Sequence, residues 1–216
     1  MAEIEACIFD LDGVIVDTAK YHYLAWRELA NKLGFDFTLE QNEQLKGVSR
    51  MASLEILLGI GKISLTEDQK NDYADEKNQR YVEMVSQMKP DEIIPGAKDF
   101  LIQVQKAGLK TALGSASKNA TAILDRLNLT QYFNVIIDGN KVFKAKPDPE
   151  VFTKGADGLN IKYQKCVVFE DAEAGIEAAK AANMKCVGIG SPSNLGKADL
   201  VIDGLHQMTI EKLKLL

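Results

Sequence analysis

The sequence is poor in the residues that build disulfide frameworks and zinc sites. Its 216 residues include only three cysteines, Cys7, Cys166 and Cys186, and their positions form no metal-ligand spacing. All three fall in segments with the pattern of buried strands, where a free cysteine serves as a small apolar residue in a reducing compartment. The composition therefore argues against a disulfide scaffold and a zinc module.

An excess of basic residues and a long apolar run are also missing. The formal net charge is −5, which argues against nucleic acid or an anionic membrane as the main partner. No segment approaches the ~20 apolar residues needed to span a bilayer, and the first residues lack the basic and apolar regions of a signal peptide. Internal repeats and low-complexity tracts are absent. These absences favour a cytoplasmic enzyme for small molecules, without nucleic-acid or membrane partners.

The first third of the chain has the pattern of helices. From about residue 18 to 33 apolar residues recur at helical spacing, and Gly34 is a stop signal. The residues expected on the inner face of this helix are Tyr21, Leu24, Ala25 and Leu29. Thr66-Glu67-Asp68-Gln69 is a capping box that opens a long charged helix to about Met88. We therefore predict that residues 17–89 form an all-helical domain.

From residue 90 onward, strand and helix patterns alternate. After a first strand near residues 4–9, strands are expected at Lys110–Gly114, Val135–Asp138, Cys166–Phe169, Cys186–Ile189 and Leu200–Ile202. The helices expected between them lie near residues 95–108, Asn119–Leu127, Pro149–Gly155 and Glu173–Asn183. Such alternation forms right-handed βαβ units. We predict an α/β fold: a Rossmann-like, doubly wound parallel sheet of residues 1–16 and 90–216 that carries the helical domain as an insert.

Two aspartates follow the first strand directly. Asp10 and Asp12 occupy alternate positions of an extended chain, so their carboxylates face the same side, and Gly13 lets the backbone turn away. This pattern also fits an ordinary turn or the start of a calcium loop. The calcium loop fails because Val14 and Val16 stand where oxygen ligands are required. Like charges held side by side raise each other's pKa, so the pair indicates chemistry with a cation or a proton.

Polar residues also follow three later strands. Residues 115–119 follow the second strand, Lys146 lies after the third, and Glu170-Asp171 ends the fourth. The carboxyl ends of parallel strands meet at one edge of the sheet, where ligands bind. Backbone N–H groups, a hydroxyl and a lysine can hold a phosphate there, and the carboxylates suit Mg²⁺. Each group alone fits a helix cap or a surface charge. Their convergence predicts a magnesium-dependent phosphate site.

The helical stretch contributes three further candidates. Lys77 lies on the apolar stripe of its helix, where a lysine either extends to solvent or meets an anion. Arg50 has a guanidinium fork that fits phosphate, although a surface charge is equally compatible with its position. His22, one turn into its helix, fits half-buried packing as well as catalysis. The second histidine, His206, is expected to be structural.

The strand-end groups, in this order, resemble the four motifs of the haloacid dehalogenase (HAD) superfamily of phosphotransferases. The matching residues are Asp10-Leu11-Asp12-Gly13-Val14, Ser115, Lys146 and Glu170-Asp171. The resemblance covers the whole chain and implies a HAD-like fold with the insert as a mobile cap. It implies that Asp10 is the nucleophile that becomes an aspartyl phosphate. The implied ligands of Mg²⁺ are Asp10, Glu170, Asp171 and the main-chain oxygen of Asp12.

Within the superfamily the chain resembles the β-phosphoglucomutases. This resemblance is carried by residues 17–22, Trp26, 46–50, Ser53, 77–78, 115–119 and 170–171. It implies that Asp12 is the general acid and base, assisted by His22, and that Arg50 and Lys77 bind the distal phosphate. Ser115 and Lys146 complete the implied catalytic set. The implied substrate-binding residues are Thr18, His22, Trp26, Gly47, Val48, Ser49, Arg50, Ser53, Lys77, Ser115, Ala116, Ser117, Lys118, Asn119 and Lys146. Ala172 departs from relatives that have a serine there, which alters hydrogen bonding around the metal ligands.

The implied reaction interconverts β-D-glucose 1-phosphate and D-glucose 6-phosphate. β-D-glucose 1,6-bisphosphate would be the intermediate and the primer, and the cap would exclude water from the phospho-aspartate. Two alternatives remain open, a sugar-phosphate phosphatase and a non-catalytic sugar-phosphate sensor. Only the cap residues favour the mutase over the phosphatase, whereas the intact set of Asp10, Asp12, Lys146 and Asp171 speaks against the sensor. The expected protein is a monomer that binds sugar phosphates.

Overall fold

The computed structural model describes residues 3–45 and 48–216, and it divides into two compact units. The sheet unit consists of residues 3–17 and Lys89–Leu216, and the helical unit of Thr18–Met88. Each unit has its own hydrophobic core.

The sheet unit contains a six-stranded sheet in which all paired strands are parallel. Its strands are β1 Ala6–Phe9, β2 Lys110–Gly114, β3 Val135–Ile137, β4 Cys166–Glu170, β5 Lys185–Ile189 and β6 Leu200–Ile202. All six were predicted, and only their ends differ. The strand order is β3-β2-β1-β4-β5-β6, so the direction of winding reverses between β1 and β4. Ligands of doubly wound sheets bind beyond the strand ends at this reversal, which is where the predicted site residues lie.

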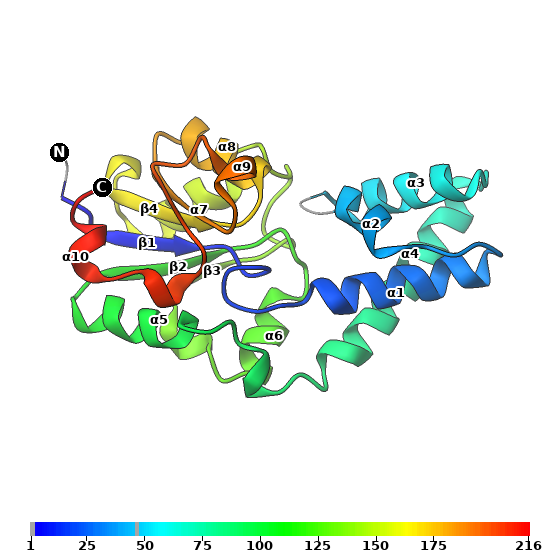
Figure 1. The fold of residues 1–216 in the computed structure, drawn as a ribbon, viewed down its shortest axis with the longest axis horizontal. Helices are drawn as coiled ribbons and strands as arrows, with labels where there is room; N and C mark the ends of the chain where they lie inside the picture. Colours follow the sequence, from blue (N-terminus) through cyan, green and yellow to red (C-terminus); the bar gives the residue numbers. More distant parts are fainter. Residues whose placement is uncertain (1–2, 46–47) are drawn as a thin grey trace. The chain divides into compact units, whose positions relative to one another are not determined.

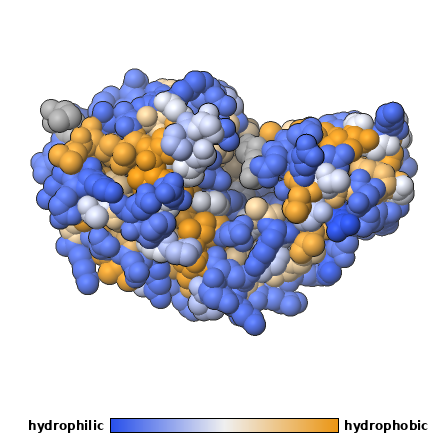
Figure 2. Space-filling model, in the orientation of Figure 1, coloured by the Kyte–Doolittle hydropathy of each residue, from blue (hydrophilic) through white to orange (hydrophobic). Residues whose placement is uncertain are grey.

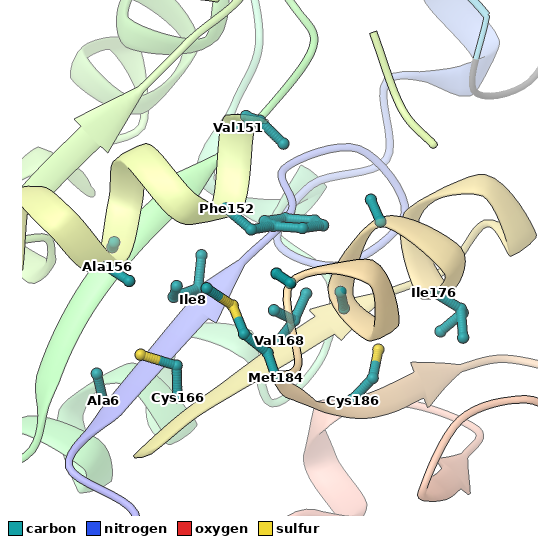
Figure 3. Close-up of a cluster of buried hydrophobic side chains, with 14 of the residues drawn as sticks. Ala6, Ile8, Val151, Phe152, Ala156, Cys166, Val168, Ile176, Met184 and Cys186 are labelled. Carbon is teal, nitrogen blue, oxygen red and sulfur yellow. The ribbon is translucent and has the colours of Figure 1, made fainter. Parts of the chain in front are cut away.

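Helices cover both faces of the sheet (Figure 1). The helices of this unit are α5 Ala97–Lys106, α6 Ala120–Arg126, α7 Glu150–Leu159, α8 Glu173–Ala181, α9 Pro192–Leu195 and α10 Ile210–Leu213. Side chains of α7 and α8 pack on Ile8 and Val168 (Figure 3). On the opposite face, the ring of Phe100 from α5 contacts those of Phe9 and Phe169. The free cysteines are buried, as the sequence predicted.

Helix α7 is longer than the sequence predicted. We expected it to end near Gly155, but it continues to Leu159. Gly155 is buried on the sheet, and a Cβ placed on it would lie 3.5 Å from Ala112 Cβ. That distance is ordinary van der Waals contact, so the site would also accommodate an alanine. The helix continues past the glycine because the residues that follow it, Ala156 and Leu159, pack in the hydrophobic core of the sheet unit. The short helices α9 and α10 were not predicted.

The helical unit contains no strand among its described residues. Its elements are α1 Ala19–Lys32, α2 Leu39–Asn42 with a 3-10 turn at Glu43–Leu45, α3 Arg50–Gly61 and α4 Glu67–Val85. The capping box of α4 forms as predicted, with hydrogen bonds in both directions between Thr66 and Gln69. Gly34 follows α1 with φ +93°, a conformation that favours glycine.

One predicted face of α1 is wrong. Leu24 was expected inside but is 45% exposed, whereas Ala25, Trp26 and Leu29 are buried. The buried stripe of α1 is thus rotated toward Trp26, because this large ring packs among Leu54, Leu57 and their neighbours. The helical spacing of the apolar residues had placed Leu24 on the inner face and had not included Trp26.

Polar side chains cover most of the face seen in Figure 2. Among the described residues, every helix is too short or too polar to span a bilayer.

Candidate active site

Asp10 and Asp12 lie where β1 ends. The N–H of Asp10 donates to the carbonyl of Phe169, 2.9 Å away, so this aspartate is fixed between the two central strands and is 6% exposed. Asp12 is half-buried in the following loop, where Gly13 has φ +79°. A Cβ on Gly13 would lie 2.1 Å from Asp171 Oδ2, so only glycine lets the loop approach that carboxylate.

Lys146 links the ends of β1 and β4. Its Nζ lies 2.6 Å from Asp10 Oδ1 and 2.8 Å from Glu170 Oε2, and the side chain is 6% exposed. Burial acts to lower the pKa of Lys146, but the charges of Asp10 and Glu170 outweigh it and raise this pKa above its ordinary value. The lysine is therefore a permanent buried cation.

The two carboxylates that hold this lysine belong to a group of three. Asp10, Glu170 and Asp171 each offer an oxygen, and these oxygens lie within 4.8 Å of one another. Burial raises the pKa of Glu170, and the neighbouring charges of Asp10 and Asp171 raise it further, against the opposing effect of Lys146. One lysine does not balance three carboxylates, and an all-oxygen donor set matches the preference of Mg²⁺. These residues fit a divalent cation.

A glycine that the sequence analysis did not single out makes room for this cluster. A Cβ on Gly175, in the first turn of α8, would lie 2.0 Å from Glu170 Cδ. Any larger residue would displace the carboxylate. The requirement depends on the approach of α8 to β4, so no local sequence signal reveals it.

Ser115 begins the loop after β2. Its N–H donates to the carbonyl of Ile137, and its hydroxyl oxygen accepts the N–H of Ser117 at 3.1 Å. Ser117 in turn accepts the N–H of Asn119 at 3.2 Å. The expectation of free N–H groups here is therefore met only in part, because the hydroxyls of the loop form local turns that occupy two of them. Ala116 and Lys118 are exposed.

The predicted residues of the sheet unit thus gather at neighbouring strand ends. Asp10, Lys146 and Glu170 are joined by direct ion pairs, and Asp171 lies against Gly13. Phe9 pairs with Leu113 in the sheet, which sets the loop of Ser115 beside the loop of Asp12.

The helical unit holds a second cluster around Lys77. This lysine is 4% exposed, and its Nζ lies 3.0 Å from His22 Nδ1. The same ammonium group lies 4.5 Å from the ring centroid of Trp26 and 5.0 Å from that of Tyr81. The rings of His22 and Tyr81 are stacked at 4.2 Å. Of the two outcomes considered for Lys77, extension to solvent is wrong, because its ammonium group folds onto aromatic rings.

The environment of His22 determines its protonation state. Burial lowers its pKa well below 6.5, and the charges of Lys77 and Arg50 lower it further. An ammonium group can only donate, so Nδ1 accepts the hydrogen bond from Lys77 and the proton of the neutral ring resides on Nε2. His22 is therefore a neutral hydrogen-bond donor in a positive local field.

The other predicted residues of this unit occupy varied positions. Arg50 is the first residue of α3, and its Nη1 lies 3.5 Å from Asp75 Oδ1. Ser49 caps the helix by accepting the N–H of Ala52. Thr18 and Ser53 are buried, and Val48 is exposed. The predicted substrate contact at Gly47 lies outside the described residues.

Comparisons with known proteins agree with this geometry. A family model of haloacid dehalogenase-like hydrolases matches residues 4–183. The β-phosphoglucomutase of Bacillus subtilis is 40% identical over 212 residues, which span 97% of this chain and 94% of the relative. The phosphorylated carbohydrates phosphatase of Thermotoga maritima is 34% identical, with 90% and 89% covered. The solved structure of β-phosphoglucomutase from Clostridium difficile matches with a TM-score of 0.92 and 47% identity, covering 97% of this chain and 95% of that one. The chain therefore belongs to the haloacid dehalogenase-like hydrolase family and, within it, to the β-phosphoglucomutases.

Proposed function

We propose that this protein is a magnesium-dependent phosphomutase that interconverts β-D-glucose 1-phosphate and D-glucose 6-phosphate. The observation that carries the proposal is the presence, in one chain, of the acidic cluster around Lys146 and the cationic cluster around Lys77 and Arg50. The first suits phosphoryl transfer, and the second suits an additional phosphate on the substrate. The identity to β-phosphoglucomutases over nearly the full chain supports the same reaction.

Asp10 is the proposed nucleophile. In the first half-reaction, phosphorylated Asp10 transfers its phosphoryl group to the sugar 6-hydroxyl, while Asp12 takes the hydroxyl proton, which yields β-D-glucose 1,6-bisphosphate. In the second, Asp10 attacks the 1-phosphate, the bond from phosphorus to the sugar oxygen breaks, and Asp12 returns the proton to that oxygen. Asp12 is half-buried and in the loop next to Asp10, which suits a group that exchanges protons with a substrate.

Charge on the transferring group would be balanced by the neighbours of Asp10. Asp10, Glu170, Asp171 and the main-chain oxygen of Asp12 would hold Mg²⁺, which supplies positive charge to the phosphoryl oxygens. Lys146 adds a second positive charge from the side of Glu170. Ser115 already accepts an N–H at its hydroxyl oxygen, so the hydroxyl hydrogen remains available to a phosphate oxygen. Residues 116–119 would extend this contact.

The helical unit would bind the phosphate that is not reacting. Burial is the main cause of the lowered pKa of His22, and the positive charges of Lys77 and Arg50 lower it further. Two positive charges near one side chain attract an anion. His22 is proposed to assist Asp12 in catalysis, with a ring that stays neutral near pH 7. The remaining proposed contacts of this unit are Thr18, Trp26, Gly47, Val48, Ser49 and Ser53.

A sugar-phosphate phosphatase is the second candidate. The relative from Thermotoga maritima, which is named a phosphorylated carbohydrates phosphatase, is 34% identical over 90% of this chain. Both reactions need Asp10 and Asp12, so the sheet unit does not separate them. The cationic cluster of the helical unit favours the mutase, because a second phosphate must be held while the first reacts.

The product formed from β-D-glucose 1-phosphate tests the proposal. The sugar is incubated with Mg²⁺ and a trace of β-D-glucose 1,6-bisphosphate, and ³¹P NMR follows both glucose 6-phosphate and inorganic phosphate. We expect glucose 6-phosphate to form much faster than inorganic phosphate, and Asp10→Asn to abolish both. Faster release of inorganic phosphate would favour the phosphatase, and full turnover in Asp10→Asn would refute both readings.

We further propose that the enzyme acts in the cytoplasm as a monomer with sugar phosphates as its partners. The free, buried cysteines support the reducing compartment, and the negative net charge supports a partner other than nucleic acid. Light scattering of the purified protein tests the monomer: a mass near 23.8 kDa is expected.

A further inference from the structure

The ammonium group of Lys146 has an aromatic neighbour in addition to its two carboxylates. Its Nζ lies 4.8 Å from the ring centroid of Phe152. An ammonium group has three N–H bonds, and two of them serve Asp10 and Glu170. The face of a phenyl ring attracts a cation, most strongly where water is excluded.

The position of Phe152 is rigid. It is the third residue of α7, fully buried, and its N–H donates to the carbonyl of Pro149 at 3.0 Å. Figure 3 shows its ring above Ile8, at the edge of the buried cluster. A Cβ on Gly114 would lie 2.8 Å from the ring, so the glycine at the end of β2 keeps the space that the ring occupies. A ring fixed in this way offers a constant surface to the lysine.

A ring is suited to this position because it adds no charge. Three carboxylates already crowd the site, and a fourth would compete for the metal and raise the pKa of its neighbours. A water molecule would offer an oxygen that competes with the nucleophile for the phosphoryl group. The π-face stabilises the cation without either effect.

We propose that Phe152 is a positioning residue, whose ring holds the ammonium group of Lys146 against Asp10 and Glu170 for phosphoryl transfer. This inference rests on the proposed function, in which Lys146 stabilises the transferring group. The alternative is that Phe152 only fills the core. The two roles differ in the property of the ring that they require. Packing in the core depends on the shape of the ring, whereas attraction of the ammonium group depends on the electron density of its face.

Stepwise fluorination of the ring separates these alternatives. Phenylalanine with one, two or three fluorine atoms is incorporated at position 152, which withdraws electron density from the face with little change of shape. We expect kcat to fall at each step, by roughly tenfold over the series, with KM nearly constant. The matched control is the same series at Phe100. This residue is equally buried, at 1% exposure, and its ring contacts the rings of Phe9 and Phe169. A flat kcat in the Phe152 series would overturn the proposal.

A second measurement does not depend on turnover. In protein with ¹³C-labelled lysine, the Cε signal of Lys146 is assigned by its loss in Lys146→Arg. We expect the aromatic ring to shift this signal in the unmodified protein. The ring-current shift should disappear in Phe152→Leu and should remain in Phe100→Leu. A Lys146 signal that stays unchanged in Phe152→Leu would refute the contact.

The substrates distinguish failure of this inference from failure of the proposed function. Kinetics are measured with β-D-glucose 1-phosphate and with p-nitrophenyl phosphate, which reports transfer to Asp10 whatever the natural sugar. Graded loss on p-nitrophenyl phosphate without turnover of the glucose phosphate would leave the role of Phe152 standing and remove the mutase. Normal mutase turnover together with an unchanged kcat across the fluorinated Phe152 series would support the mutase and remove the role of Phe152.

Discussion

The two units of this protein accommodate a buried lysine in opposite ways. In the sheet unit, Lys146 is held by Asp10 and Glu170, within a cluster of three carboxylates. In the helical unit, Lys77 lies against the imidazole of His22 and two aromatic faces. Burial and neighbouring carboxylates raise the pKa of Glu170, whereas burial and neighbouring cations lower that of His22.

The charges around the two lysines indicate which kind of ligand each unit binds. The sheet unit has an excess of negative charge that a divalent cation can balance, so it suits the chemistry. The helical unit has a positive field at His22, so it suits recognition of an anion. We therefore expect changes in the first to reduce kcat and changes in the second to raise KM.

The largest expected effect is that of Asp12→Asn. Without a group that gives and takes the proton, kcat should fall by about 10³- to 10⁴-fold, while binding of the bisphosphate persists. Stopped-flow kinetics and calorimetry with the bisphosphate measure the two quantities. The control is Asp17→Asn, which changes an exposed carboxylate in the same loop region. Near-normal turnover in Asp12→Asn would contradict its role.

Removal of the metal should have the next largest effect. We expect turnover to fall roughly 10³-fold in a chelator and to return with Mg²⁺, because the carboxylates then repel both one another and the phosphate. The assay is the same coupled production of glucose 6-phosphate. Full activity after exhaustive chelation would remove the reason given for the acidic cluster.

The metal-free protein should also lose stability as the pH rises. Burial raises the pKa of Glu170 from 4.5 to about 8, so between these values the folded protein binds more protons than the unfolded chain. The free energy of unfolding therefore falls as pH rises through this window. Melting temperatures from pH 5 to 8 measure the slope, which should be smaller in Glu170→Gln and with Mg²⁺ bound. An identical slope in all three samples would refute the assignment.

Arg50→Ala tests the recognition side of the comparison. Loss of charge-assisted hydrogen bonds to the distal phosphate should raise KM roughly 10- to 100-fold and increase leakage to inorganic phosphate, with a smaller change in kcat. The matched control is Arg27→Ala, which removes an exposed arginine paired with Asp36 in the same unit. If KM and leakage stay unchanged, the helical unit does not hold the phosphate through this residue.

The smallest effect concerns His22 and pH. Its pKa is lowered well below 6.5 in the folded protein, so below about pH 6.5 the unfolded chain takes up a proton that the folded protein does not. The contribution of His22 to the free energy of unfolding is therefore fully present above this pH and decreases as the pH falls. Melting temperatures at pH 7.5 and 5.5 should differ by about 2–4 °C more in the native protein than in His22→Gln. His206→Gln, which alters an exposed histidine, should leave the difference intact.

Much of the fold could be predicted because its signals are local. The capping box at Thr66 and the alternation of strands and helices after residue 90 depend on residues within a few positions of one another. Where long-range packing overrode the local signal, prediction failed. Leu24 is exposed because Trp26 fills the core, and α7 continues through Gly155 because Ala156 and Leu159 pack in the core beyond it.

Periodicity and turn signals locate the strand ends, so the residues that follow each strand can be identified before the fold is known. What each of these residues contacts depends on how the distant parts of the chain pack together. Lys146 pairs with Asp10, which lies 136 residues away in the sequence, and the ring of Phe152 lies against the ammonium group of Lys146. Gly175 leaves the space that the carboxylate of Glu170 occupies. Contacts of this kind depend on how the helices pack on the sheet. Many residues contribute to the free energy of that packing, so no single local sequence pattern predicts it.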